Sequence, residues 1–310
     1  MTFGRHILFF IGCISLSGCG APNDAALPKT AVVSENAVKP QKIISINPCI
    51  DAILIKVAEP SQIAAISHYS KNPVSSSISA QDAAKYPAIG DNIEEIIAKK
   101  PDMVFATFAS PQMENTLSKA GIKIISLSIP QSIDESKEQI RQIADAVHGK
   151  ARGEGVIKQI DDAIASAAPN SMAAYGQDAP KHIDALIWGG GGLVPGKGTL
   201  IDDMMAKAGL NNYSSQYGLD QWDILPLEYL VQQPPAIFFN SAKQRGQTGQ
   251  NGTIGQDDAA RISGHRVLNM LASKMQVERF EPKLLSCGGP NIIEAMAVFR
   301  DARNKYEGLK

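Results

Sequence analysis

Residues 91–106 read DNIEEIIAKKPDMVFA, and this stretch shows how the chain is built. Apolar residues at helical spacing predict a helix over 93–99 that carries Glu94 near its start. Pro101 cannot continue that helix and pushes the residue before it into an extended conformation. The apolar run Met103–Ala106 then predicts a short buried strand. The stretch therefore consists of three parts in order: a helix with a glutamate near its start, a proline that ends the helix, and a strand.

The same order recurs in residues 227–238, LEYLVQQPPAIF, where Glu228 takes the place of the early glutamate. Elsewhere short apolar runs alternate with helical patterns. Strands are expected at 43–46, 63–67, 122–126, 182–188 and 236–240, and helices at 51–58, 113–120, 136–147, 200–208 and 291–306. Strand–helix alternation predicts an α/β fold with mostly parallel sheets covered by helices.

The longest helical pattern in the middle of the chain is Ala151–Ala168. It is either a connector between two lobes or an ordinary surface helix. With the connector interpretation, residues 42–148 form an N-terminal lobe, residues 149–170 a connecting helix, and residues 171–310 a C-terminal lobe.

The N-terminus predicts export. The apolar run that starts at Ile7 is too short and too weakly flanked to span a membrane, so residues 1–19 are interpreted as a signal peptide. Its end, Leu16–Cys19 (LSGC), resembles a bacterial lipobox, in which Cys19 is lipidated; a plain secretion signal is the alternative. Residues 20–41 lack apolar periodicity and are interpreted as a flexible tether. The expected location is the periplasm, anchored to a membrane by lipid.

Charge and cysteine content narrow the possible functions of the protein further. The formal net charge is −1, so no basic excess indicates binding to nucleic acid. Of the four cysteines, Cys13 would leave with the signal and Cys19 would carry lipid. Cys49 and Cys287 would remain in an oxidising compartment. They could form a disulfide, stay as two separate thiols, or bind a metal.

Three segments in order resemble one known family. They are KIISINPCIDAILIKVAEPSQIAAISHYS at 42–70, IGDNIEEIIAKKPDMVFA at 89–106 and GKGTLIDDMMAKAGLNN at 196–212. They are similar to the substrate-binding proteins of ABC importers for vitamin B12, ferric siderophores and haem. The resemblance runs from about Lys42 to the C-terminus and is thinner between 241 and 280.

The resemblance implies two α/β lobes bridged by one long helix, with the ligand in the cleft between them. It also implies that Glu94 and Glu228 dock on arginines of a membrane permease, where charge pairing sets orientation and association rate. Two solvated glutamates on helix faces are the alternative. The expected partners are the ABC permease and its ATPase. No cofactor of the protein's own is expected, and the protein is expected to be a monomer.

The glycine-rich stretch 188–199, WGGGGLVPGKGT, nearly matches a phosphate-binding loop. Such a loop needs a hydroxyl group for magnesium at the position of Gly198, so a nucleotide site is not expected. Glycine lets the backbone approach a ligand closely. The resemblance places Trp188, Gly189 and Gly190 on the cleft wall of the second lobe; a plain flexible turn is the alternative.

Further ligand contacts are expected in loops at strand ends, since ligands of α/β sheets bind there. Aromatic rings suit large apolar chelates. His68 could ligate a metal, contact a polar ligand rim, or be an ordinary loop residue. Trp222 stands where the vitamin B12 binder of this family also has tryptophan, whereas two further tryptophans of that protein match Ala88 and Thr107 here. The expected contacts, besides those of the glycine stretch, are Asn47, Cys49, His68, Tyr69, Phe108 and Trp222.

These features together predict a binding protein rather than an enzyme. The sequence contains no G-x-S-x-G and no H-E-x-x-H motif. It has five histidines, which gives little support to a metal site made of several of them. The expected ligand is cobalamin or a corrinoid-like metal chelate, with a ferric siderophore or haem as the alternative. An exported two-lobed enzyme and a ligand-free scaffold lipoprotein are the alternatives from other classes.

Overall fold

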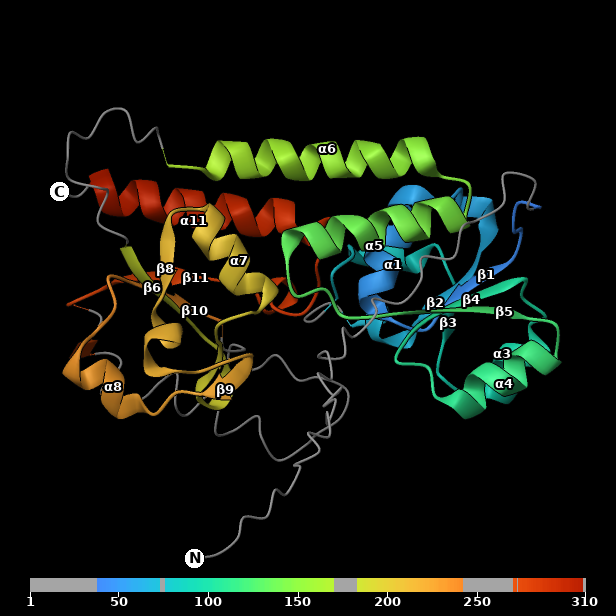
Figure 1. Ribbon diagram of the computed structural model, residues 1–310, viewed down its shortest axis with the longest axis horizontal. Coiled ribbons are helices and arrows are strands. Elements are labelled where there is room, and N and C mark those ends of the chain that lie inside the picture. The colour runs from blue at the N-terminus through green and yellow to red at the C-terminus, as the bar shows by residue number, and fades with distance from the viewer. Residues whose placement is uncertain (1–37, 73–75, 170–182, 242–269, 272, 309–310) are drawn as a thin grey trace, which may run out of the picture. The chain divides into compact units, whose positions relative to one another are not determined.

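A computed structural model describes residues 38–72, 76–169, 183–241, 270–271 and 273–308 of the 310-residue chain. The chain from Val38 onward forms one compact unit. Within it, the fold is α/β with mostly parallel sheets, as predicted (Figure 1).

The first sheet has five strands in the order β3-β2-β1-β4-β5, and all its pairings are parallel. Its strands are β1 (Ile43–Ser45), β2 (Ile63–Ser67), β3 (Ala88–Ile89), β4 (Met103–Thr107) and β5 (Lys123–Leu127). The helices of this half are α1 (Pro48–Val57), α2 (Ala80–Ala84), α3 (Ile93–Ala98), α4 (Pro111–Lys119) and α5 (Ile133–Ala146). Short 3₁₀ turns, η1 (Pro60–Gln62) and η2 (His68–Lys71), flank β2.

Successive residues of the central strands face opposite layers of helices, as the period of two in a strand requires. Ile43 and Phe105 pack in the largest core cluster, together with α1 and α5. Their neighbours Ile44 and Val104 pack in a separate cluster with α3 and α4. The sheet is thus covered on both faces, which is why its strands read as continuous apolar runs.

The second sheet has four parallel strands in the order β11-β10-β6-β8. They are β6 (Ile183–Trp188), β8 (Leu210–Asn212), β10 (Ile237–Asn240) and β11 (Gln276–Arg279). An antiparallel pair, β7 (Leu193–Pro195) and β9 (Trp222–Ile224), lies outside that sheet. The remaining elements of this half are η3 (Gly190–Gly192), α7 (Leu200–Lys207), η4 (Tyr213–Tyr217), α8 (Leu227–Gln232), η5 (Pro282–Leu284) and α11 (Asn291–Gly308).

Helix α6 (Lys150–Ala167) packs against helices from both halves. It contacts α1 and α5, which precede it in the chain, and α11, which follows it. Figure 1 shows α6 and α11 running side by side. The connector interpretation is compatible with this packing and stays a prediction. The largest core cluster likewise includes side chains of both sheets, among them Phe105 of β4 and Phe239 of β10.

The folded part starts before the predicted end of the tether at Gln41. The side chain of Gln62 donates a hydrogen bond to the Pro40 carbonyl (2.8 Å), and the Gln41 N–H donates to Asp102 Oδ2 (2.7 Å). Pro40 is buried. Residues 40 and 41 therefore belong to the folded half rather than to a tether.

The predicted strands and helices are present with small shifts at their ends. For example, α1 begins at Pro48 rather than at 51, because proline is well suited to the first turn. The strands β3, β7, β8, β9 and β11 were not predicted. They are short, and their pairing partners decide their conformation more than their own sequence does. In the part of the chain described above, no helix has both the length and the apolar character needed to cross a membrane.

Candidate functional site

Four of the predicted contacts lie at one edge of the first sheet. Parallel strands end at a common edge, and there β1 leads to Asn47, β2 to His68 and Tyr69, and β4 to Phe108. The side chains of Tyr69 and Phe108 are 59% and 72% exposed. Such large apolar side chains in solvent at the strand ends are candidates for contact with a ligand.

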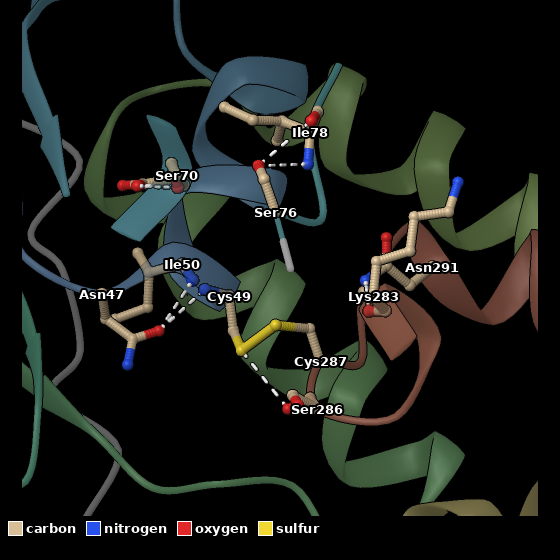
Figure 2. The surroundings of a disulfide bond; sticks show 12 residues. Asn47, Cys49, Ile50, Ser70, Ser76, Ile78, Lys283, Ser286, Cys287 and Asn291 are labelled. Atoms are coloured by element: carbon tan, nitrogen blue, oxygen red, sulfur yellow. Dashed lines mark hydrogen bonds between the residues drawn. A yellow bond between two sulfur atoms is a disulfide. The ribbon is translucent and has the colours of Figure 1, made fainter. Parts of the chain in front are cut away.

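Asn47 starts helix α1. Its side-chain oxygen accepts hydrogen bonds from the N–H groups of Cys49 (2.9 Å) and Ile50 (3.2 Å), as Figure 2 shows. This N-cap satisfies two of the N–H groups that the first turn leaves open. Because the oxygen is used by the cap, only the amide nitrogen of Asn47 is left to contact a ligand.

The structure joins Cys49 to Cys287 by a disulfide, with the two Cα atoms 5.0 Å apart (Figure 2). This confirms the first of the three alternatives for these residues. Cys49 therefore offers no thiol to a ligand or metal, which corrects that part of its predicted role. Its Sγ lies 3.4 Å from the Ser286 carbonyl oxygen; a disulfide sulfur has no proton, so this is a contact and not a hydrogen bond.

His68 and Tyr69 stand side by side on the turn η2, and both are exposed. Their ring centroids are 4.0 Å apart, with the planes tilted by 36°. The Ser67 hydroxyl oxygen accepts a hydrogen bond from the Tyr69 N–H (3.3 Å) and so caps the turn. At the other end of η2, Lys71 Nζ donates to the Tyr86 carbonyl (2.5 Å). The turn thus presents an imidazole and a phenol together.

A buried carboxyl group that is not among the predicted contacts, that of Asp51, bonds to this turn. Asp51 Oδ2 accepts hydrogen bonds from the Ser67 N–H (2.9 Å) and the Ser70 hydroxyl (2.6 Å). Among the described residues, Oδ1 has no hydrogen-bond partner of normal geometry. Burial raises the pKa of Asp51 to about 7, although hydrogen bonding with Ser45, with Ser70 and with the Ser67 N–H acts in the opposite direction. One signal was available: an aspartate inside the apolar run IDAIL of a helix.

The prediction that Trp188 lines the ligand cleft is wrong. Its side chain is 2% exposed and packs in a core cluster of the second half, with its ring centroid 6.2 Å from that of Phe238. The last residue of β6 points its ring inward because its place in the strand faces the core. Trp188 is therefore a core residue here, and its ring does not line a surface.

The glycines after Trp188 have a structural reason. The Gly189 N–H donates to the Leu193 carbonyl (2.8 Å), and a Cβ on Gly189 would lie 2.9 Å from that oxygen. Gly191 and Gly192 have φ values of 73° and 86°, which favour glycine. The turn alternative thus explains three of the four glycines. Gly190 is exposed, and its role in ligand contact stays a prediction.

The end of this stretch, residues 196–199, leads directly into helix α7. Thr199 caps α7: its hydroxyl oxygen accepts from the Asp202 N–H (3.2 Å), and the hydroxyl donates to the Gly196 carbonyl (2.9 Å). The hydroxyl is buried and fully used by the protein itself.

The antiparallel pair of the second half carries an apolar surface patch formed by Leu193, Trp222 and Ile224. Leu193 pairs with Ile224, and Pro195 pairs with Trp222. Trp222 is 41% exposed and Ile224 is 53% exposed. Of these three, the sequence predicts Trp222 alone as a contact; Leu193 and Ile224 join it only through the β7–β9 pairing, which no sequence pattern indicates.

Two of the exposed aromatic residues occur next to unusual backbone. Phe108 has a φ of 54°, and Gln221, which precedes Trp222, has a φ of 57°. Residues other than glycine rarely adopt this left-handed conformation, and where it occurs it often marks a functional site. The two positions therefore support Phe108 and Trp222 as candidates.

Glu94 and Glu228 occupy equivalent places, each in the first turn of a short exposed helix. Asn92 caps α3 by accepting the Glu94 N–H (2.9 Å), whereas α8 begins after Pro226 without a side-chain cap. Both glutamates are exposed. An acid at a helix start is stabilised by the helix dipole in any case, so docking on a permease stays a prediction.

A hollow of about 270 Å³ lies between α1, α6 and the start of α11, lined by Lys56, Arg152, Gly155, Val156, Gln159 and Pro290. None of the predicted ligand contacts lines it. Across the described ranges, no group of three or more His, Cys, Asp and Glu side chains is placed to hold a metal ion. The predicted lipidation site Cys19 lies outside the described residues.

Two comparisons of sequence are informative. Residues 43–263 match the sequence profile of the family described as periplasmic binding protein. A curated relative, the "Uncharacterized ABC transporter substrate-binding lipoprotein YvrC" of Bacillus subtilis (strain 168), is 21% identical over 322 residues, which cover 94% of each chain.

Solved structures show the same fold. The periplasmic vitamin B12 binding protein BtuF of Vibrio cholerae has a TM-score of 0.62 at 16% identity, over 86% of this chain and 98% of its own. The periplasmic haem binding protein HutB of Vibrio cholerae has a TM-score of 0.62 at 15% identity, over 87% of this chain and 98% of its own.

Proposed function

This chain belongs to the periplasmic binding protein family and is a substrate-binding protein of an ABC transporter, and from that premise we propose that it captures a metal-containing macrocycle. The proposed ligand is a corrinoid or haem, with a ferric siderophore as the alternative. In this proposal the protein binds and delivers its ligand and performs no reaction on it.

The observation that carries the proposal is the set of exposed apolar side chains at the strand ends of the first half and on the β7–β9 pair of the second. They are Tyr69, Phe108, Leu193, Trp222 and Ile224. Large apolar side chains that gather on an exposed surface, as on the β7–β9 pair, often mark a ligand or partner site. Flat rings and branched aliphatic side chains suit the faces of a large planar ligand.

The neighbouring polar groups support a metal chelate in particular. His68 and Tyr69 present an imidazole nitrogen and a phenol oxygen next to each other. Either group can contact a metal centre or the polar rim of its chelate. One or two such groups are enough when a macrocycle supplies the other ligands of the metal. The relatives with solved structures that bind vitamin B12 and haem have ligands of this class.

Delivery rests on the two glutamates and the lipid anchor. Glu94 and Glu228 are exposed at the starts of α3 and α8, where arginines of a permease could reach both. Lipidation of Cys19 would hold the protein at a membrane facing the periplasm. The proposed partners are therefore the permease and ATPase of one importer, with the likeness to a substrate-binding lipoprotein as support.

The test is calorimetric titration of the full chain in detergent with cyanocobalamin, hemin and a ferric hydroxamate siderophore. We expect saturable one-to-one binding of cyanocobalamin or hemin, and a shifted absorption band if His68 or Tyr69 reaches the metal. Binding of the siderophore alone would replace the substrate and keep the transport function. No binding of any of the three would overturn the proposed ligand class and favour a scaffold lipoprotein.

A further inference from the structure

The carboxyl group of Asp51 connects helix α1 to the turn that carries His68 and Tyr69. Its side chain is fully buried. One oxygen, Oδ2, accepts from the backbone of Ser67 at the start of η2 and from the hydroxyl of Ser70 inside it. His68 and Tyr69 lie between these two serines. The carboxyl group therefore holds the turn on both sides of the pair.

We propose that Asp51 is a positioning residue of the ligand site, which fixes η2 against α1 so that His68 and Tyr69 stand together at the strand ends. The proposal rests on the proposed function, since it assigns the position of two proposed ligand contacts. It adds a buried residue that does not itself reach the surface.

The geometry of η2 explains why the turn needs this support. The turn has only four residues, too few for a regular run of internal hydrogen bonds. The Ser67 hydroxyl is already used as a cap for the Tyr69 N–H. The rings of His68 and Tyr69 are exposed, so they gain little from packing against the protein. Their position therefore depends on the residues on either side of them.

Groups near Asp51 indicate that its role is not to pair with a cation. On η2, the imidazole of His68 is exposed and Lys71 Nζ bonds to the carbonyls of Ala83 and Tyr86. On β1 and β2, the groups that affect its pKa are Ser45 and Ser67, and no charged side chain of the described residues contributes. A buried carboxyl group without a cation is costly to fold. Its cost is offset here by the hydrogen bonds that anchor the turn.

The test compares three variants of the full chain in detergent by hemin titration and absorption spectroscopy. Asp51→Ala removes the acceptor of both hydrogen bonds. Asp51→Asn keeps one oxygen at the same place, so it should rescue. Asp102→Ala is the control, because its carboxylate also accepts two hydrogen bonds, both of them from backbone N–H groups (Gln41 and Lys42), but lies at the opposite end of the strands.

We expect Asp51→Ala to weaken hemin binding by roughly tenfold or more, as loss of two hydrogen bonds to one buried group implies. Its bound haem spectrum should change. Asp51→Asn should stay within about threefold of the wild type with an unchanged spectrum, because one hydrogen-bond acceptor is retained. Asp102→Ala should change neither affinity nor spectrum. Wild-type binding by Asp51→Ala, or failure of Asp51→Asn to rescue, would overturn the proposal.

Two further measurements keep the result clear. If Asp51→Ala does not fold, Ser70→Ala removes one of the two hydrogen bonds and should weaken hemin binding by about threefold; an unchanged affinity would contradict the proposal. If the wild type binds no chelate, the proposed function fails, and amide hydrogen exchange decides the positioning role by itself. The N–H groups of Tyr69 and Asn72 do not bond to Asp51. They should exchange faster in Asp51→Ala than in Asp102→Ala, and equal rates would overturn the proposal.

Discussion

Cys49 in the first turn of α1 and Cys287 just before α11 are joined by a disulfide across 238 residues of sequence. The residues that follow Cys287 are also held by a hydrogen bond and by close packing. The Gly289 N–H donates to Ser136 Oγ of α5 (2.7 Å), and a Cβ on Gly289 would lie 2.7 Å from the side chain of Ile53. The segment that leads into the last helix is therefore fixed to α1 and α5 of the first half.

Replacing both cysteines by serine should lower the free energy of unfolding by about 2–5 kcal/mol, since the bridge closes a long loop in the unfolded chain. Urea unfolding followed by circular dichroism would measure the change. The wild type in a strong reductant is the control and should unfold at the same urea concentration as the double variant. Equal stability of the oxidised wild type and the double variant would show that the bridge contributes nothing.

The two tryptophans should respond in opposite ways. Trp222→Ala should weaken binding of the preferred chelate by more than about 1 kcal/mol, because an exposed ring that packs on a ligand typically contributes that much. Its unfolding curve should hardly move. Isothermal titration measures the first effect. An unchanged dissociation constant would remove Trp222 from the ligand site.

Trp188→Ala is the matched variant for the buried ring. Because the Trp188 ring fills the core, its removal should lower the free energy of unfolding by about 3–5 kcal/mol. Ligand affinity of the fraction that stays folded should be close to that of the wild type, because the ring does not reach the surface. If Trp188→Ala were as stable as the wild type but failed to bind, the ring would be a ligand contact after all.

These two residues also show what the sequence could and could not predict. Alternating strands and helices were readable because proline and apolar periodicity mark them locally, as at Pro101 and Pro234. The direction of the Trp188 ring could not be predicted from the sequence, because it depends on which face of β6 meets the core. Leu193 and Ile224 become a patch only through the pairing of β7 with β9. Asp51 acquires its role from a turn that follows it by sixteen or more residues.

Docking should depend on charge at both Glu94 and Glu228. The double reversal Glu94→Lys and Glu228→Lys should abolish uptake of the chelate in cells, since repulsion from arginines of the permease disfavours the encounter. Affinity for the chelate should be unchanged in a titration. Glu114→Lys is the control: this glutamate is exposed on α4 and should tolerate reversal. Loss of chelate affinity in the double variant would mean that the two glutamates act in the ligand site.

The stability of the protein should decrease as the pH rises, because of Asp51. Burial raises its pKa from 3.8 to about 7 in the folded protein, so between these values the folded state binds more protons than the unfolded state. The contribution of neutral Asp51 is complete below pH ~4 and is lost as the pH rises through about 7. From pH 5 to pH 8, the wild type should lose about 2–3 kcal/mol more of its unfolding free energy than Asp51→Asn. Urea unfolding at several pH values measures this difference. Parallel curves for the wild type and Asp51→Asn would mean that the carboxyl group titrates near its ordinary pKa and that the unpartnered Oδ1 is reached by water.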